Sequence, residues 1–239
     1  MPTAKINDID VYYEIHGEGR PLVLIAGLAS GVSLFAMSIP IFSKDRQVVA
    51  FDNRGAGRSG KPDIPYTIEM MADDTVGLMR ALGVKQADVL GVSMGGRIAM
   101  ELAIRYPELV RGLILVSTSA RVTKESRSSF GLRFGKQTKI ITGSGALGGS
   151  PQPYHAFVHQ LEATAKFDCT SQLGGITAPT LIMRGDKDTL APKNLVEEVH
   201  SGIKGSKLVE FKGGHTFFLW RNKKFTEAVS EFLQTLASG

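Results

Sequence analysis

Six short apolar runs recur along the chain, and within each run the apolar residues are mostly consecutive rather than alternating with polar ones. The runs span residues 21–26, 46–52, 87–92, 111–117, 179–185 and 206–211. Strands of this composition are buried on both faces, as in a parallel sheet that helices cover on each side. The sequence therefore predicts a covered, mostly parallel sheet at the centre of the fold.

Helix-forming segments separate several of these strands. Residues 68–82 carry apolar side chains at the spacing of one helix face, with Thr67 able to cap the start and Gly83 the end. Residues 225–236 repeat this spacing. Apolar and polar residues alternate over 9–15, which indicates an antiparallel strand with one wet face near a sheet edge. Strands that alternate with helices predict an α/β fold with right-handed crossovers.

The alternation of strand and helix patterns is interrupted between residues 121 and 173. The first part of that segment is rich in glycine, serine and threonine and has no strong period. Residues 154–167 can form one helix, with one face made of Tyr154, Phe157, Val158, Leu161 and Ala165. A long aperiodic segment inside a compact domain is usually a lid or a linker. We therefore expect a small cap, residues 121–173, inserted into a core of residues 1–120 and 174–239.

Composition places the chain among ordinary globular proteins. Of its 239 residues 43% are hydrophobic and 21% charged, and no apolar run approaches the ~20 residues that span a bilayer. The N-terminal residues have neither the basic nor the apolar region of a signal peptide, so we expect a cytoplasmic protein without a membrane partner. The one cysteine, Cys169, excludes an intramolecular disulfide, and we expect it to be a small buried group.

The net charge of +5 is concentrated in one segment, residues 121–139, which carries six basic residues and a single acid. Nucleic-acid binding and attraction of anionic small substrates are two interpretations. No aromatic residues alternate with these charges and no nucleic-acid motif follows, so a solvated basic face is favoured. We expect no nucleic-acid partner, and the sequence leaves a homo-oligomer open.

A serine stands among glycines directly after the third of these runs. Residues 91–95 read G-V-S-M-G, and an apolar strand precedes Ser93 while a helical pattern follows it. A strand that turns at once into a helix strains the backbone at the bend and brings neighbouring chains close together, so glycine suits the positions two before and two after the serine. The hydroxyl is then exposed at a helix N-terminus, where negative charge is stabilised. This context predicts that Ser93 is a nucleophile.

A serine nucleophile needs a base, and the base needs an acid that orients it. His215 follows the last strand, at the sheet edge that also holds Ser93, whereas His200 belongs to an outer helical pattern. His155 and His159 are four residues apart on the expected cap helix; with no third ligand in evidence, a cap or surface role is favoured over a metal site. The segment RGDKDTLAP follows the strand 179–185 and offers two acids, Asp186 and Asp188.

Together these motifs resemble the α/β-hydrolase fold family, in particular its small esterases, enol-lactonases and haloperoxidase-like serine hydrolases. The matching stretches are LVLIAGLAS, FDNRGAGRSG, GVSMGG, PTLIMRGDKDTLAP and GGHTFF. The resemblance implies a mostly parallel, twisted sheet of eight strands flanked by helices, with a small inserted cap. It also implies the order serine, acid, histidine, and the family spacing favours Asp188, with Pro192 after it, over Asp186.

The resemblance implies two oxyanion-hole donors, the backbone N–H groups of Met94 and Leu28. Where relatives commonly read His-Gly-x this chain has Ala26, so a side chain that braces the loop is replaced. FDNRGAGRSG is interpreted as a turn-stabilising network beneath the site. Arg97, one helical turn after Ser93, could bind a substrate carboxylate, as in the menaquinone-synthesis lyase of this family, or could turn to solvent or an acidic neighbour.

Three hypotheses follow for the function. The leading one is a serine hydrolase that cleaves a small-molecule carboxylic ester or lactone, with no metal or organic cofactor. A second keeps the fold and changes the reaction to elimination or carbon–carbon cleavage of an anionic metabolite, which the basic segment of the expected cap and Arg97 suggest. A third is a ligand receptor without catalysis on a hydrolase scaffold, because one fold hosts many functions.

Overall fold

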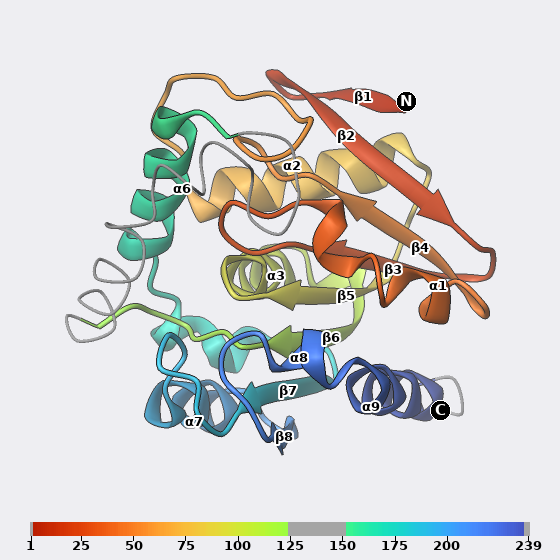
Figure 1. Ribbon diagram of the computed structural model, residues 1–239, viewed down its shortest axis with the longest axis vertical. Helices are drawn as coiled ribbons and strands as arrows, with labels where there is room; N and C mark the ends of the chain where they lie inside the picture. The colour runs from red at the N-terminus through yellow and green to blue at the C-terminus, as the bar shows by residue number, and fades with distance from the viewer. Residues whose placement is uncertain (1, 124–151, 237–239) are drawn as a thin grey trace.

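The computed structural model describes residues 2–123 and 152–236 and shows one twisted sheet with helices on both faces (Figure 1). Eight strands form the sheet in the order β1-β2-β4-β3-β5-β6-β7-β8. β1 and β2 pair antiparallel, as do β2 and β4, and all later pairs are parallel. The strands are β1 (Thr3–Ile6), β2 (Ile9–His16), β3 (Arg20–Ile25), β4 (Arg46–Phe51), β5 (Ala87–Val92), β6 (Val110–Val116), β7 (Thr180–Gly185) and β8 (Lys207–Phe211).

Helices connect the strands and cover the sheet. They are η1 (Val32–Phe35), α1 (Ile39–Phe42), α2 (Ile68–Ala81), α3 (Met94–Arg105), η2 (Pro107–Leu109), α6 (Tyr154–Lys166), η4 (Thr170–Gly175), α7 (Lys193–Gly202), α8 (Phe217–Trp220) and α9 (Asn222–Thr235). The expected capping of α2 is present, since Thr67 Oγ1 accepts a hydrogen bond from Met70 N at 3.1 Å and Gly83 follows with a φ of +71°.

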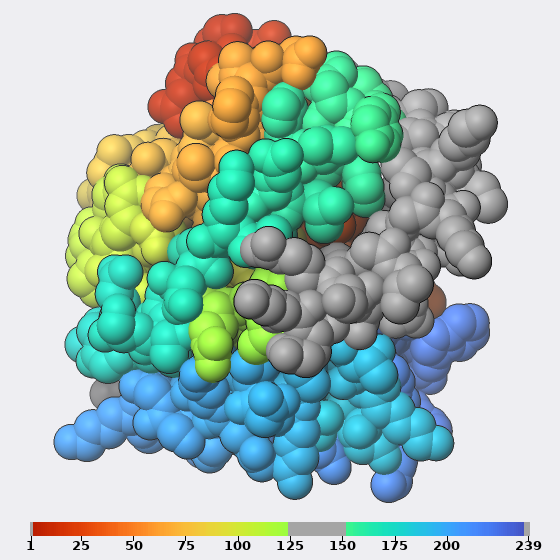
Figure 2. Space-filling model, turned by 90° about the vertical axis from the view of Figure 1, so that its left-hand side faces the viewer, coloured from red at the N-terminus to blue at the C-terminus, as the bar shows by residue number. Residues whose placement is uncertain are grey.

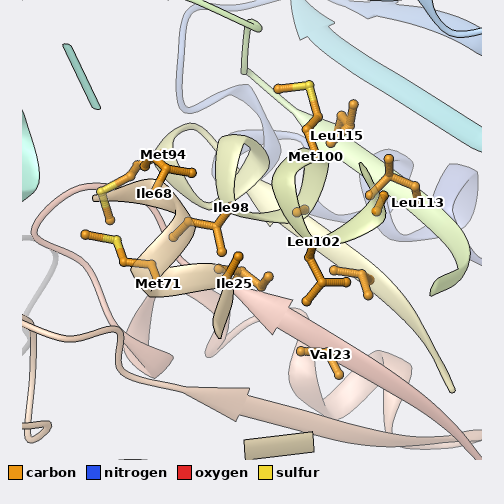
Figure 3. Packing of buried hydrophobic residues seen from close by; sticks show 14 of the residues in the cluster. Val23, Ile25, Ile68, Met71, Met94, Ile98, Met100, Leu102, Leu113 and Leu115 are labelled. Atoms are coloured by element: carbon orange, nitrogen blue, oxygen red, sulfur yellow. The ribbon is translucent and has the colours of Figure 1, made fainter. Parts of the chain in front are cut away.

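The strand residues alternate between two apolar cores. Val23, Ile25, Leu113 and Leu115 face a core shared with α2, α3, α6 and α7, part of which is seen in Figure 3. Their neighbours in sequence, such as Leu22, Leu24 and Ile114, face a second core made with η1, α1, α8 and α9. Because both faces are buried, the strands need apolar residues at consecutive positions, which is the pattern that the sequence displays.

The predicted fold class is confirmed: the sheet is mostly parallel, has eight strands and carries helices on both faces. Two details of the sequence interpretation were wrong. β8 is an edge strand whose residues are all at least partly exposed, because no ninth strand covers it. Ile15, at the end of β2, is 44% exposed, so the alternation expected over 9–15 does not reach the strand's end.

The buried face of α6 also differs from the predicted one. Tyr154 is 65% exposed, whereas Gln160 is fully buried. The buried side chains of the helix are Ala156, Phe157, Gln160, Ala163 and Thr164. The apolar pattern alone therefore predicted the wrong buried face for α6. The reason is that a polar side chain, Gln160, lies at the centre of the contact between this helix and the core.

Only part of the proposed cap, residues 121–173, belongs to the described structure. α6 and most of η4 lie within it, and residues 124–151, with most of the basic segment, lie outside the described residues. Arg121 is described, and its guanidinium forms an ion pair with Glu198 at 3.0 Å. Within the described ranges, no helix is long and apolar enough to cross a bilayer.

Candidate active site

The turn between β5 and α3 exposes Ser93 in a strained backbone conformation, with φ 55° and ψ −114°. A Cβ atom on Gly91 would lie 2.2 Å from the carbonyl oxygen of Gly95, and one on Gly95 would lie 2.1 Å from the carbonyl oxygen of Ile25. Both positions therefore need glycine for the close approach of α3 to the sheet. The strain at Ser93 fixes its hydroxyl at the N-terminus of α3.

Ser93 is hydrogen-bonded to His215, which follows β8. Nε2 of His215 lies 3.0 Å from Ser93 Oγ, and Nδ1 lies 2.9 and 3.0 Å from the two carboxylate oxygens of Asp188. A carboxylate only accepts hydrogen bonds, so Nδ1 carries the proton and Nε2 is free to accept one from Ser93. Of the two acids left open by the residues, the structure brings Asp188 to His215.

The environment of Asp188 keeps it ionised. Its side chain is fully buried, and Oδ1 accepts hydrogen bonds from the backbone N–H groups of Leu190 and Ala191 at 2.9 and 3.0 Å. Burial by itself raises the pKa of Asp188, but the bond to His215 and these N–H groups outweigh it and leave the pKa below the ordinary value. Asp186 instead bonds to Lys212 and to the backbone of Gly213.

Two backbone N–H groups lie next to Ser93 on different elements, that of Leu28 on the loop after β3 and that of Met94 at the first residue of α3. Among the described residues, neither donates to a hydrogen-bond acceptor. The loop that carries Leu28 touches the nucleophile, since a Cβ atom on Gly27 would lie 3.3 Å from Ser93 Cβ. N–H groups without acceptors beside a nucleophile can hold an oxyanion.

The FDNRGAGRSG segment braces this loop from below. Asn53 Nδ2 donates to the carbonyl oxygen of Ala26 at 3.0 Å, and Asp52 Oδ1 accepts from Val32 N at 2.7 Å. The other oxygen of Asp52 accepts from Arg58 N at 2.8 Å. These contacts agree with the structural role predicted for the segment, because they hold the loop that carries Ala26 and Leu28.

Sequence reasoning missed two residues that hold the elements of the site together. Thr118 Oγ1 donates to the carbonyl oxygen of Ser93 at 2.7 Å, and Ser117 Oγ donates to that of His215 at 2.8 Å. Both residues directly follow β6 at the carboxyl edge of the sheet. That position, after a buried strand, was the signal available in the sequence.

Arg97 points toward the end of β6. One terminal nitrogen of its guanidinium donates to Ser119 Oγ at 2.9 Å, while Nε is buried without a partner. Arg97 is 3% exposed, and burial lowers its pKa to about 10, which still leaves it protonated at neutral pH. No acid within residues 2–123 or 152–236 forms an ion pair with it. A buried cation without a paired anion is energetically costly.

The remaining candidates lie away from this constellation. His159 pairs with Asp63 at 2.8 Å and His155 Nε2 contacts the carbonyl oxygen of Lys61, so both histidines hold α6 against the loop after β4. His200 bonds to Ser206. Burial raises the pKa of the Cys169 thiol to about 12, which suits an inert buried group. Within the described part of the chain, no three histidine, cysteine or acidic residues group as metal ligands would.

Comparison with known proteins gives matches over nearly the whole chain. A family profile for the alpha/beta hydrolase fold matches residues 20–139. The chain is 31% identical to a protein of Azorhizobium caulinodans provisionally named carbamate hydrolase RutD, with 97% of this chain and 98% of that protein covered. It is also 31% identical to the serine hydrolase BPHL of Mus musculus, with 97% and 85% covered.

A solved structure leads to the same family. The enol-lactonase from Burkholderia xenovorans LB400 superposes with a TM-score of 0.86, covers 98% of this chain and 100% of its own, and is 26% identical. The sheet order, the turn at Ser93 and these full-length matches agree. The chain therefore belongs to the alpha/beta hydrolase fold family and is a hydrolase built on that fold.

Proposed function

We propose that the chain is a serine hydrolase that cleaves carboxylic esters or lactones through an acyl-enzyme on Ser93. The observation that carries this proposal is the continuous hydrogen-bonded chain from Ser93 Oγ through His215 to Asp188. The names of the serine hydrolase of Mus musculus and the enol-lactonase of Burkholderia xenovorans support the same class of reaction.

In this proposal each residue has a defined role. His215 Nε2 takes the proton of Ser93 Oγ as that oxygen attacks the substrate carbonyl. Asp188 holds the imidazole in the reactive tautomer and stabilises its charged form. The N–H groups of Leu28 and Met94 bind the oxyanion, His215 protonates the leaving alcohol, and a water activated by His215 then releases the acyl group.

The test is a panel of short and medium nitrophenyl esters, lactones and carbamates, assayed with the wild type and with Ser93→Ala. Carbamates are included because of the name of the Azorhizobium caulinodans relative. Ser93→Ala should lower kcat/KM by about 10⁴-fold or more on every substrate that the wild type cleaves. Ser201→Ala, at an exposed position on α7, is the matched control and should match the wild type. Equal rates for the wild type and Ser93→Ala across the panel would refute the proposal.

A second candidate, the lyase or carbon–carbon hydrolase of an anionic metabolite, is favoured by one observation. Arg97 is a buried cation without an acidic partner among the described residues. Matched neutral and carboxylate-bearing substrates test it: Arg97→Met should then lose activity on the anionic member alone. Equal effects on both members would count against an anionic substrate. A receptor without catalysis is distinguished by turnover, since it would release at most one product per molecule.

A further inference from the structure

The loop that carries the Leu28 N–H is held from two sides. We call residues 26–32 the oxyanion loop; Asn53 and Asp52 hold its two ends, as described above. Its middle is held by α6, because the backbone N–H of Ala29 donates to Gln160 Oε1 at 3.0 Å. The two partners are 131 residues apart in the sequence.

Both ends of the Gln160 amide are engaged. Oε1 also accepts from Gln152 Nε2 at 2.9 Å, and Gln160 Nε2 donates to the carbonyl oxygen of Arg54 at 2.7 Å. Ala29 N–H can only donate and Arg54 C=O can only accept, so the orientation of the amide is determined by its neighbours. In Figure 2 the green surface of α6 borders the orange surface of the segment after β4.

The position of this contact bears on the oxyanion donor. Ala29 has a φ of +56°, a left-handed conformation that is unfavourable for alanine and needs support from its surroundings. The peptide group between residues 27 and 28 carries the Leu28 N–H. The preceding peptide group is held at the oxygen of Ala26 and the following one at the nitrogen of Ala29. The peptide group itself is held at the oxygen of Gly27, which accepts from Ser30 N at 3.2 Å, so the Leu28 N–H lies in a run of three held peptide groups.

A glutamine on the buried face of a helix is otherwise unfavourable. Gln160 is fully buried, next to the apolar side chains Ala156, Phe157 and Ala163 on the same face. Burying an amide costs free energy unless its hydrogen bonds are made, so an apolar residue would suit a helix that only packs. The bond to Ala29 means that the Gln160 amide holds the oxyanion loop, which an apolar side chain at this position would not do.

We propose that Gln160 is a positioning residue for the reaction, which holds the Leu28 N–H in oxyanion-hole geometry through the backbone of Ala29. The packing of α6 against the core then positions the oxyanion loop. The helix therefore contributes to the reaction as well as covering the core. This inference rests on the proposed function, because it assigns a residue to the oxyanion hole of that reaction.

The kinetic test compares three variants on an ester that the wild type cleaves. Gln160→Met keeps the size of the side chain and removes its hydrogen bonds; kcat should fall about 10- to 100-fold with KM within about twofold, since the loss acts on the transition state. Affinity for an alkyl boronic acid, which forms a tetrahedral adduct with the serine, should fall by the same factor as kcat/KM.

Two matched controls separate positioning from simple docking of the helix. Thr164→Val removes a buried hydroxyl without a hydrogen-bond partner one turn further along α6. Gln152→Met removes the bond to the carbonyl oxygen of Gly55 and one partner of Gln160, without touching the oxyanion loop. Both should keep kcat within about threefold of the wild type. A loss in Thr164→Val equal to that in Gln160→Met, or no loss in Gln160→Met, would overturn the inference.

A second measurement does not depend on turnover. In protein labelled with ¹⁵N-alanine, the amide proton of Ala29 should exchange with deuterium at least about tenfold faster in Gln160→Met than in Thr164→Val. If Gln160→Met does not fold, Gln160→Asn replaces it, because its amide is one methylene shorter and cannot reach both Ala29 and Arg54. An inactive wild type would refute the proposed function, whereas an active wild type with unchanged kcat and exchange in the variant would refute only the role of Gln160.

Discussion

The carboxylate of Asp188 accepts from Nδ1 of His215 with both of its oxygens, at 2.9 and 3.0 Å. Asp188→Asn presents an amide that can donate to the imidazole and so favours the wrong tautomer. We expect kcat to fall about 10⁴-fold in ester hydrolysis. Asp186→Asn, two residues away and bonded to Lys212, is the matched control and should keep most of its activity. Similar losses in the two variants would contradict the assignment of Asp188.

The same carboxylate predicts how stability depends on pH. Although burial acts to raise it, the pKa of Asp188 in the folded protein lies below the ordinary value of 3.8. The unfolded chain therefore binds this proton more readily, and the corresponding stabilisation is present above about pH 3.8 and is lost as the pH falls through the folded pKa. The difference in the free energy of unfolding between the wild type and Asp188→Asn should shift against the wild type as the pH falls below about 3.8. Denaturant titrations between pH 7 and 3 measure it, and a difference that stays constant below that pH would contradict it.

Arg54 forms one ion pair with a buried acid and another with an exposed acid. The buried pair should contribute more to the free energy of unfolding than the exposed pair. Arg54 contacts Asp74, whose side chain is 3% exposed, at 2.6 Å and Asp8, whose side chain is 51% exposed, at 2.9 Å. Asp74→Ala leaves a buried cation without its main partner and should lower the free energy of unfolding by about 3–5 kcal/mol. Asp8→Ala should cost less than about 1 kcal/mol. Urea denaturation of both variants measures the difference, and equal losses would contradict it.

The closeness of α3 to the sheet predicts a steric effect at Gly95. An alanine there would place its Cβ atom 2.1 Å from the carbonyl oxygen of Ile25, which forces the helix or the strand to move. Gly95→Ala should lower both the melting temperature and kcat, because Ser93 and Met94 move with the helix. Gly174→Ala, where nothing lies within 4 Å, should leave both unchanged. Normal activity in Gly95→Ala would show that the turn tolerates a side chain.

Much of this fold is visible in the sequence because its causes are local. The turn at Ser93 can be recognised within a few residues, since the steric need for Gly91 and Gly95 follows directly from a strand that meets a helix. The buried strands can be recognised by consecutive apolar residues, because burial on both faces of the sheet requires them. The exposed edge at β8 was missed, because the order of strands in the sheet decides which strand lacks a neighbour.

The sequence by itself determined the alternation of strands and helices, the serine at the turn and the histidine after the last strand. The resemblance to the family already favoured Asp188 as the acid, and only the tertiary structure decided where the guanidinium of Arg97 points and how α6 is rotated. The contact between Ala29 and Gln160 joins residues from opposite halves of the chain, and no local period encodes it. Such contacts depend on how the elements pack as a whole, so the apolar pattern of the helix did not identify Gln160 as the side chain that holds the oxyanion loop.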